Sequence, residues 1–345
     1  IEQLRPRSPA GDGAWRIPRG DEIYAAALRQ ATTTEFSPEE VHRIGLEQVA
    51  EISAQLDLVL KAAGLSTGAV GERLAALNTR PEQLYPDSAQ GRADLIASLN
   101  AGVAKMNALL PQAFATLPDQ PLDIRAVPVE IQDGAANGYY YSATLDGSRP
   151  AIYWINLKEV SDWPKYSLPS LTYHEGTPGH HLQISLAQKS DNIPLIRKTG
   201  GFSAYSEGWA LYSEQVADEL GAYDGIEKAG YLQSFLFRAS RLVVDTGLHA
   251  KRWSREKATD YMVATTGFTR PRTLREVERY CTSIGQACSY KMGHIAWLRA
   301  REKAQKTMGD KFDIKQFHEV LLDGAMPLSI LEKRIEERTA AAMKA

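Results

Sequence analysis

The sequence predicts a mainly α-helical (α+β) fold in which a small β-sheet comes directly before a histidine-rich helix. After Pro169, almost every segment has apolar residues at helical spacing. Residues 121–157 instead contain short runs of β-branched and aromatic residues, with Ala151–Leu157 as the strongest strand and Asp146–Pro150 as a turn. This change in residue pattern predicts a helical fold with one small sheet.

The N-terminal region, residues 1–120, is expected to be helical and to continue without a domain break into residues 121–345. Ser37 to Glu40 is typical of a helix start, because Ser37 can cap the helix and Glu40 can complete a capping box. A second helix is expected over about 89–110. Later helices are expected at about 170–190, 203–220, 225–251, 254–265, 273–303, 313–323 and 328–343.

Composition excludes several classes of function. The chain has 345 residues, 43% of them hydrophobic and 24% charged, with a net charge of -2. This balance gives no electrostatic reason to expect nucleic acid as a partner. No apolar run approaches the roughly 20 residues of a transmembrane segment. The charged opening, Ile1 to Arg7, does not have the pattern of a signal peptide.

Three of the seven histidines lie within the eight residues from His174 to His181. A regular zinc helix has the pattern His-Glu-x-x-His, with its histidines four residues apart on one face. Here position 178 is proline. In an unbroken helix His180 would be turned about 240° from His174, and His181 would lie about 10.5 Å along the axis.

A zinc site on this segment therefore requires a distorted helix. Pro178 removes a backbone donor, and Gly179 relaxes the backbone. A bulge that loops out two residues would bring His180 to the place where a regular helix has its second histidine. We expect His174 and His180 to bind the metal, with His181 as the alternative to His180.

A third ligand is expected on the following helix. Glu207 and Glu214 are seven residues apart, so they share one helix face, and Glu207 is far enough from His180 for a turn and a returning helix. Catalytic zinc sites have three protein ligands and one open position. The sequence thus predicts one Zn²⁺ held by His174, His180 and Glu207, with Glu214 as the alternative carboxylate.

Four segments in this order resemble the bacterial "domain of unknown function 885" family. They are Tyr173–Gln183 (YHEGTPGHHLQ), Glu207–Glu214 (EGWALYSE), Arg241–His249 (RLVVDTGLH) and Gly285–Gly293 (GQACSYKMG). The resemblance implies a zincin-like metallopeptidase of the gluzincin type and a periplasmic or otherwise exported protein. Because full members are longer, it also implies that this chain corresponds to their C-terminal portion.

The resemblance also implies roles for side chains around the metal. Glu175, directly after a ligand, would be the general base. Tyr290 is the expected oxyanion donor, by analogy with helical peptidases that use a tyrosine late in the chain. His249, Lys291 and His294 are weaker candidates for the oxyanion or for a substrate carboxylate.

The expected strand 151–157 is a candidate for substrate binding. It would lie beside the cleft and offer its edge to an extended peptide, with Tyr153 and Asn156 as contacts. The substrate would be a short peptide.

Two other functions are compatible with the same residues. A zinc amidohydrolase or esterase could use these ligands on small non-peptide amides, and a zincin-like protein could bind peptides without catalysis.

Overall fold

The computed structural model describes residue 6 and residues 9–344, and the fold is mainly α-helical, with about 68% helix and one three-stranded sheet. The predicted fold class is therefore confirmed. The helices are α1 (Gly20–Thr32), α2 (Pro38–Ala62), α3 (Val70–Asn78), α4 (Ala89–Leu109), α5 (Leu168–Glu175), α6 (His180–Lys189), α7 (Leu195–Thr199), α8 (Ser203–Glu219), α9 (Glu227–Ala250), α10 (Arg255–Thr266), α11 (Arg270–Thr282), α12 (Ser289–Met308), α13 (Ile314–His318) and α14 (Leu328–Lys344).

The chain divides into two compact units. Unit 1 consists of Ile1–Ala76 and Phe235–Ser289, and unit 2 of Leu77–Ser234 and Tyr290–Ala345. Each unit is thus discontinuous in sequence, and the expected continuity from residues 1–120 into residues 121–345 stays a prediction. None of the helices in the described part of the chain combines the length and apolarity needed to cross a membrane.

Unit 1 contains α1, α2, α10 and α11 with most of α3 and α9. The predicted start of α2 is confirmed, since Ser37 accepts a hydrogen bond from the Glu40 amide while the Ser37 amide donates to Glu40 Oε2 at 2.8 Å.

The prediction of one continuous helix over 273–303 is wrong, because the chain leaves helical geometry between α11 and α12. Gly285 has φ +80° there and packs against Leu28.

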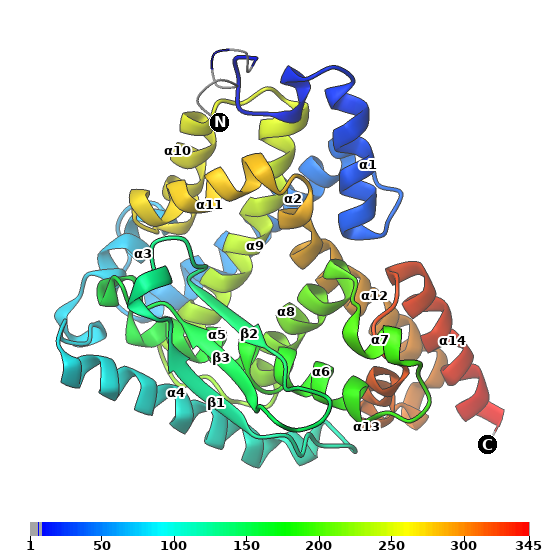
Figure 1. The fold of residues 1–345 in the computed structure, drawn as a ribbon. Coiled ribbons are helices and arrows are strands. Elements are labelled where there is room, and N and C mark those ends of the chain that lie inside the picture. Colours follow the sequence, from blue (N-terminus) through cyan, green and yellow to red (C-terminus); the bar gives the residue numbers. More distant parts are fainter. Residues whose placement is uncertain (1–5, 7–8, 345) are drawn as a thin grey trace. The chain divides into compact units, whose positions relative to one another are not determined.

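Unit 2 contains the sheet, formed by β1 (Leu122–Ala126), β2 (Gly138–Tyr141) and β3 (Ala151–Ile155) in the order β1-β3-β2. β3 pairs in parallel with β1, Leu122 opposite Ala151, and antiparallel with β2, Tyr140 opposite Tyr153 (Figure 1). The prediction that the 151–157 strand offers a free edge is therefore wrong. Its strongly apolar sequence places it in the centre, where both edges are paired.

Two apolar clusters hold unit 2 together. One lies between the sheet and α4 and includes Leu95, Leu99, Tyr153 and Ile155. The other joins α8, α12 and α13 through packed aromatic side chains, among which Trp209 and Trp297 meet edge to face with ring centroids 5.0 Å apart and have no exposed surface. α8 therefore runs through the core of unit 2, which gives its polar side chains fixed positions.

Candidate metal centre

The histidine segment is divided between two helices. α5 ends at Glu175, and α6 begins at His180, with residues 176–179 as a non-helical connection that contains the cis peptide Thr177–Pro178. The prediction of a bulge within one continuous helix is wrong in this detail. Gly179 permits the break, because a Cβ at this position would lie 1.9 Å from the carbonyl oxygen of His174. The start of α6 is thereby brought against the last turn of α5.

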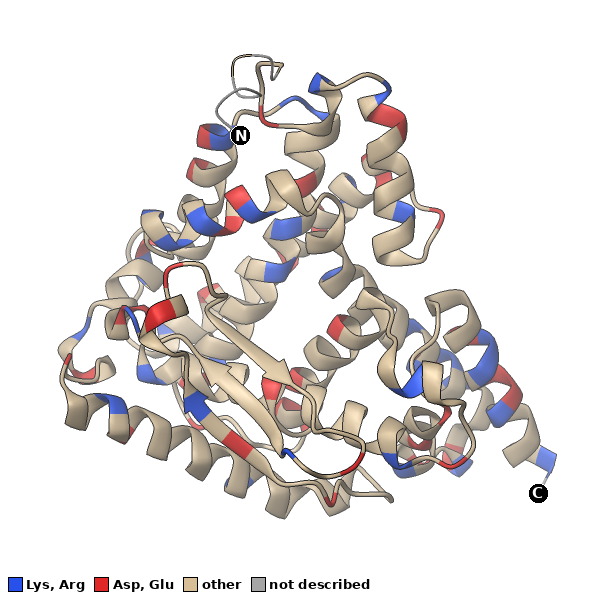
Figure 2. Cartoon of the chain, in the orientation of Figure 1, with Lys and Arg blue, Asp and Glu red and all other residues tan. Residues whose placement is uncertain are grey.

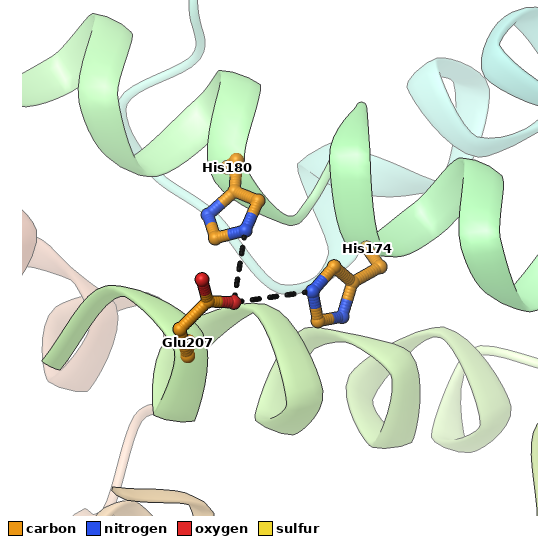
Figure 3. A group of neighbouring side chains, drawn as sticks. All are labelled: His174, His180 and Glu207. Carbon is orange, nitrogen blue, oxygen red and sulfur yellow. Dashed lines mark ion pairs between the residues drawn. The ribbon is translucent and has the colours of Figure 1, made fainter. Parts of the chain in front are cut away.

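His174, His180 and Glu207 point toward one another from α5, α6 and α8 (Figure 3). Glu207 Oε2 lies 3.5 Å from His174 Nε2 and 3.3 Å from His180 Nε2. One potential ligand atom from each residue lies within 4.8 Å of the others. Both histidines are buried, and 20% of the Glu207 side chain is exposed. These are the three residues predicted from the sequence, and together they could hold a metal ion.

The hydrogen bonds around the cluster orient electron-pair donors toward its centre, where a cation could bind. His174 Nδ1 lies 2.8 Å from Glu214 Oε1. Because a carboxylate only accepts, the proton is on Nδ1, and Nε2 presents a lone pair toward Glu207. Glu207 Oε2 is buried and receives no hydrogen bond from the described residues. Two donors of electron pairs therefore face each other across a short gap, an arrangement that suits a metal ion between them.

The charge of Glu207 is consistent with this arrangement. Burial alone would raise the pKa of the Glu207 carboxyl, but positive charge on His180 and His174 holds that pKa well below its usual range, and a metal ion between neutral imidazoles would supply positive charge at the same point. The group is therefore anionic at neutral pH. Two imidazole nitrogens and one carboxylate oxygen form a donor set that zinc accepts.

Glu214 lies behind the cluster and does not belong to it. The side chain is fully buried, its Oε1 accepts from His174, and its Oε2 accepts from the Ser170 hydroxyl. The seven-residue spacing predicted to put Glu207 and Glu214 on one face of α8 does so, but the two carboxylates face opposite nitrogens of the same imidazole. Such a carboxylate fixes the tautomer and orientation of a metal-binding histidine.

Trp209 connects α8 to the break between α5 and α6. Its indole Nε1 donates to the carbonyl oxygens of Pro178 at 2.9 Å and Gly179 at 3.3 Å. The helix that carries Glu207 thus also fixes the connection between the two histidines. This role of Trp209 was not predicted from the sequence. The signal was present in the Glu-Gly-Trp order, because a buried indole needs an acceptor.

His181 points away from the cluster. Its Nε2 lies 3.0 Å from the Gln120 carbonyl oxygen, and its Nδ1 lies 3.2 Å from the Tyr140 hydroxyl. Burial lowers the pKa of His181 to about 4, against the opposing effect of the Gln120 carbonyl. Of the two neighbouring histidines, the structure therefore brings His180 to His174.

α12 approaches α8 closely enough to place Tyr290 near the cluster. A Cβ on Gly208 would lie 2.4 Å from the Gly293 backbone, and one on Gly293 would lie 2.0 Å from the Ala204 oxygen. Only glycines permit this contact. The Tyr290 ring stacks on His174 with centroids 6.3 Å apart. This predicted residue is therefore next to the candidate ligands.

Lys291 and His294, from the same helix, form a buried pair. Lys291 Nζ lies 3.3 Å from His294 Nδ1, and His294 Nε2 lies 3.1 Å from Gln215 Oε1. Burial, reinforced by the Lys291 charge, holds the pKa of His294 well below its usual range, so the imidazole is neutral. Their predicted contact with substrate stays a prediction.

The remaining predicted residues have different surroundings. Glu175, the last residue of α5, is buried beside His174, and its charge adds to burial in raising the pKa of Tyr153. Tyr153 has no exposed surface, and the Asn156 side chain donates to the Gln132 carbonyl oxygen at 2.8 Å. Tyr153 is thus enclosed in the core, and the Asn156 side chain is bonded to the backbone. Their predicted substrate contacts stay predictions.

His249 lies in unit 1, whereas the cluster lies in unit 2. Its Nδ1 accepts from the Ala14 amide at 2.9 Å, and its Nε2 donates to the Tyr280 carbonyl oxygen at 3.1 Å. Both ring nitrogens are therefore bonded to the backbone of unit 1. The catalytic role expected for His249 stays a prediction.

Comparison with known proteins places the chain among bacterial proteins without an assigned function. The family model described as "Bacterial protein of unknown function (DUF885)" matches residues 2–335. No curated protein matches the chain.

Three solved structures are similar to different degrees. A protein described as "the putative lipoprotein from Colwellia psychrerythraea" has 45% identity and a TM-score of 0.97, over 99% of this chain and 59% of that one. Another of unknown function, from Shewanella oneidensis, has 18% identity and a TM-score of 0.80, over 97% of this chain and 62% of that one. A Pyrococcus furiosus carboxypeptidase, with 11% identity and a TM-score of 0.33 over 94% of this chain and 80% of that one, is too dissimilar for an argument. The chain spans about three fifths of the length of the first two.

Proposed function

The chain belongs to the bacterial DUF885 family, and for it we propose the function of a zinc-dependent hydrolase that cleaves peptides. The observation that carries the proposal is the convergence of His174, His180 and Glu207 on one point, where the buried Oε2 of Glu207 has no hydrogen-bond partner among the described residues. A buried carboxylate oxygen facing two imidazole nitrogens is unfavourable without a cation between them.

Zinc is the ion that we propose for this site. Its usual catalytic ligand sets include two histidines and one glutamate with an open fourth position. Glu214 would hold His174 through Nδ1, so that Nε2 stays directed at the metal. When bound, Zn²⁺ would polarise a substrate carbonyl and lower the pKa of a water molecule toward about 7.

Glu175 is our candidate for the general base. It follows His174 directly at the end of α5, and its side chain is buried. We propose that its carboxylate takes a proton from the attacking water and delivers it to the leaving amine. Tyr290, stacked on His174, would donate its hydroxyl proton in a hydrogen bond to the developing oxyanion.

A peptide is the substrate class that we favour over a small amide or ester. Tyr140 of the edge strand β2 lies beside the candidate ligand His180, with ring centroids 6.3 Å apart. An edge strand next to the reacting centre can pair with an extended peptide backbone. A small non-peptide substrate would not use that edge.

A metal analysis and a peptide panel test this proposal. The purified chain should hold one equivalent of zinc and cleave short peptides, and Glu175→Gln should lower kcat roughly 10²–10⁴-fold while zinc occupancy is unchanged. Full activity of Glu175→Gln would contradict the role of the base. Hydrolysis of amides or esters without any peptide cleavage would instead favour an amidohydrolase.

A further inference from the structure

A pocket of about 670 Å³ lies within unit 2, and two of the helices that line it, α6 and α8, carry the candidate ligands His180 and Glu207. This volume is in the range of pockets that bind small ligands. It is lined by the segment after β2, by α6, by α7 with the two residues after it, by the start of α8 and by Ala325.

Two lining residues connect the pocket to the proposed ligands. Gln183 is three residues after His180 on α6, so the two side chains share a helix face. Ser206 comes directly before Glu207 on α8. A substrate bound at the metal centre could therefore extend one of its groups into this pocket.

Three cationic side chains line the pocket, and none of them has an ion pair with a carboxylate in the described part of the chain. Arg197 donates to the carbonyl oxygens of Asp323, Gly324 and Ala325, at 2.7–3.4 Å. Lys198 Nζ donates to the Gln188 oxygen at 2.9 Å.

Arg149, the third cation, donates to the Pro150 oxygen at 2.9 Å and stacks on the Tyr141 ring. Neutral backbone oxygens and an aromatic ring fix these cations without cancelling their charge. Figure 2 shows in blue the basic residues of α7, which carries Arg197 and Lys198.

The acidic residue in the lining does not balance these charges. Asp146 uses Oδ1 to accept hydrogen bonds from the Ser148 amide and hydroxyl, at 3.0 and 2.7 Å. With three cations against one carboxylate, the pocket has an excess of positive charge. Such a lining favours an anionic group, and guanidinium and ammonium groups both bind carboxylates well.

Gln183 adds a second, independent indication of a ligand. Its side chain is only 2% exposed, and its buried Oε1 has no hydrogen-bond partner among the described residues. An unpaired buried acceptor costs free energy unless a ligand supplies a donor. A peptide N–H group is such a donor, so the pocket offers both an acceptor for an amide and cations for a negative charge.

We propose that this pocket binds a carboxylate of the peptide substrate, with Arg149, Arg197 and Lys198 around the charge and Gln183 accepting from a neighbouring peptide N–H. The inference rests on the proposed peptidase function and names the substrate class, peptides with a negative charge close to the scissile bond. The carboxylate is either the C-terminus of the peptide or an acidic side chain, and the experiment separates the two.

Binding measured without turnover tests the pocket. The background is the full chain with Glu175→Gln, titrated by calorimetry with four N-acetylated hexapeptides. Hexa-alanine with a free C-terminus is compared with its C-terminal amide. An amidated peptide with one central glutamate is compared with the same peptide carrying glutamine. One charged peptide should bind roughly tenfold more tightly than its neutral partner, and the pair that differs identifies the source of the carboxylate.

Substitutions in the pocket give the matched comparison. Lys198→Gln combined with Arg149→Gln should abolish the preference, whereas Lys306→Gln, an exposed cation outside the pocket, should keep it. Equal binding within both peptide pairs, or no binding of any of the four, would overturn the proposal. If the double variant does not fold, the peptide pairs alone decide the outcome.

The test also separates this inference from the proposed function. Selective binding of the charged peptides, together with no cleavage by the unsubstituted chain, would support the pocket and contradict the peptidase. Cleavage of charged and neutral peptides at equal rates and affinities would support the peptidase and overturn the pocket.

Discussion

Unit 2 contains two groups of buried histidines that differ in what their ring nitrogens contact, His318 alone and His174 with His180. His318 Nδ1 donates to the Ala113 carbonyl oxygen, and its Nε2 accepts from the Tyr212 hydroxyl, both at 2.9 Å. Its ring stacks on Phe114. His174 and His180 are similarly buried, yet each directs Nε2 at a carboxylate oxygen that receives no hydrogen bond from the described residues. Burial of a histidine is therefore common to both groups. The candidate site differs because its two histidines face one carboxylate oxygen that has no hydrogen-bond partner among the described residues.

The largest expected effect comes from exchanging one histidine of each group for alanine. His174→Ala should lose bound zinc and activity, because it removes a proposed ligand. His318→Ala should keep the zinc stoichiometry but lower the free energy of unfolding by about 2–4 kcal/mol, because it leaves a cavity and two unpaired polar groups. Elemental analysis measures the zinc content of both variants, and denaturant unfolding measures their stability. Equal zinc content in both variants would remove the proposed difference between the groups.

A smaller effect is expected at the residue that supports His174 from behind. Glu214→Gln keeps the shape of the side chain but removes the charge that orients the imidazole. Zinc affinity should fall about 10–100-fold, measured by competition with a chelator. Gln215→Glu, at a neighbouring residue of α8 outside the cluster, is the control for a changed charge on this helix. An unchanged zinc affinity of Glu214→Gln would show that the Glu214–His174 contact does not orient a ligand.

The smallest effect concerns pH. Burial lowers the pKa of His318 to about 3, against the opposing Ala113 carbonyl and with a further small decrease from Arg301. The unfolded chain takes up this proton near pH 6.5 and the folded chain does not, so the free energy of unfolding falls as the pH decreases from about 6.5 toward 3. The contribution is at most about 1.4 kcal/mol per pH unit. His318→Phe should be less stable at neutral pH but have a shallower slope below pH 6, and parallel slopes would contradict this assignment.

Local patterns in the sequence predicted most of the secondary structure and the members of the cluster. The capping box of α2, the three strands and the histidines with Glu207 all depend on residues close in sequence. Predictions failed where distant contacts decide the outcome. The central position of β3 depends on β1 and β2, and the helix break after Glu175 depends on the packing of Gly179 against α5.

The cationic pocket could not be predicted for the same reason. Arg149 comes from the segment between β2 and β3, whereas Arg197 and Lys198 come from α7, and no periodicity relates them. α1 and α3 lie in the region 1–120 that was expected to be helical, but no bounds were predicted for them, although α1 has only a single Gly, at its first residue. Tertiary packing of these helices outweighed weak local signals.

The positions of the three proposed ligands in the chain have a consequence for assembly. All of them lie between residues 174 and 207, so an ion at this point would close only short loops and would join three nearby helices as a local cross-link. Closing short loops costs little chain entropy. The α5–α8 segment could therefore acquire its metal early in folding, and the thermal midpoint of unit 2 should rise with the concentration of free zinc above the dissociation constant.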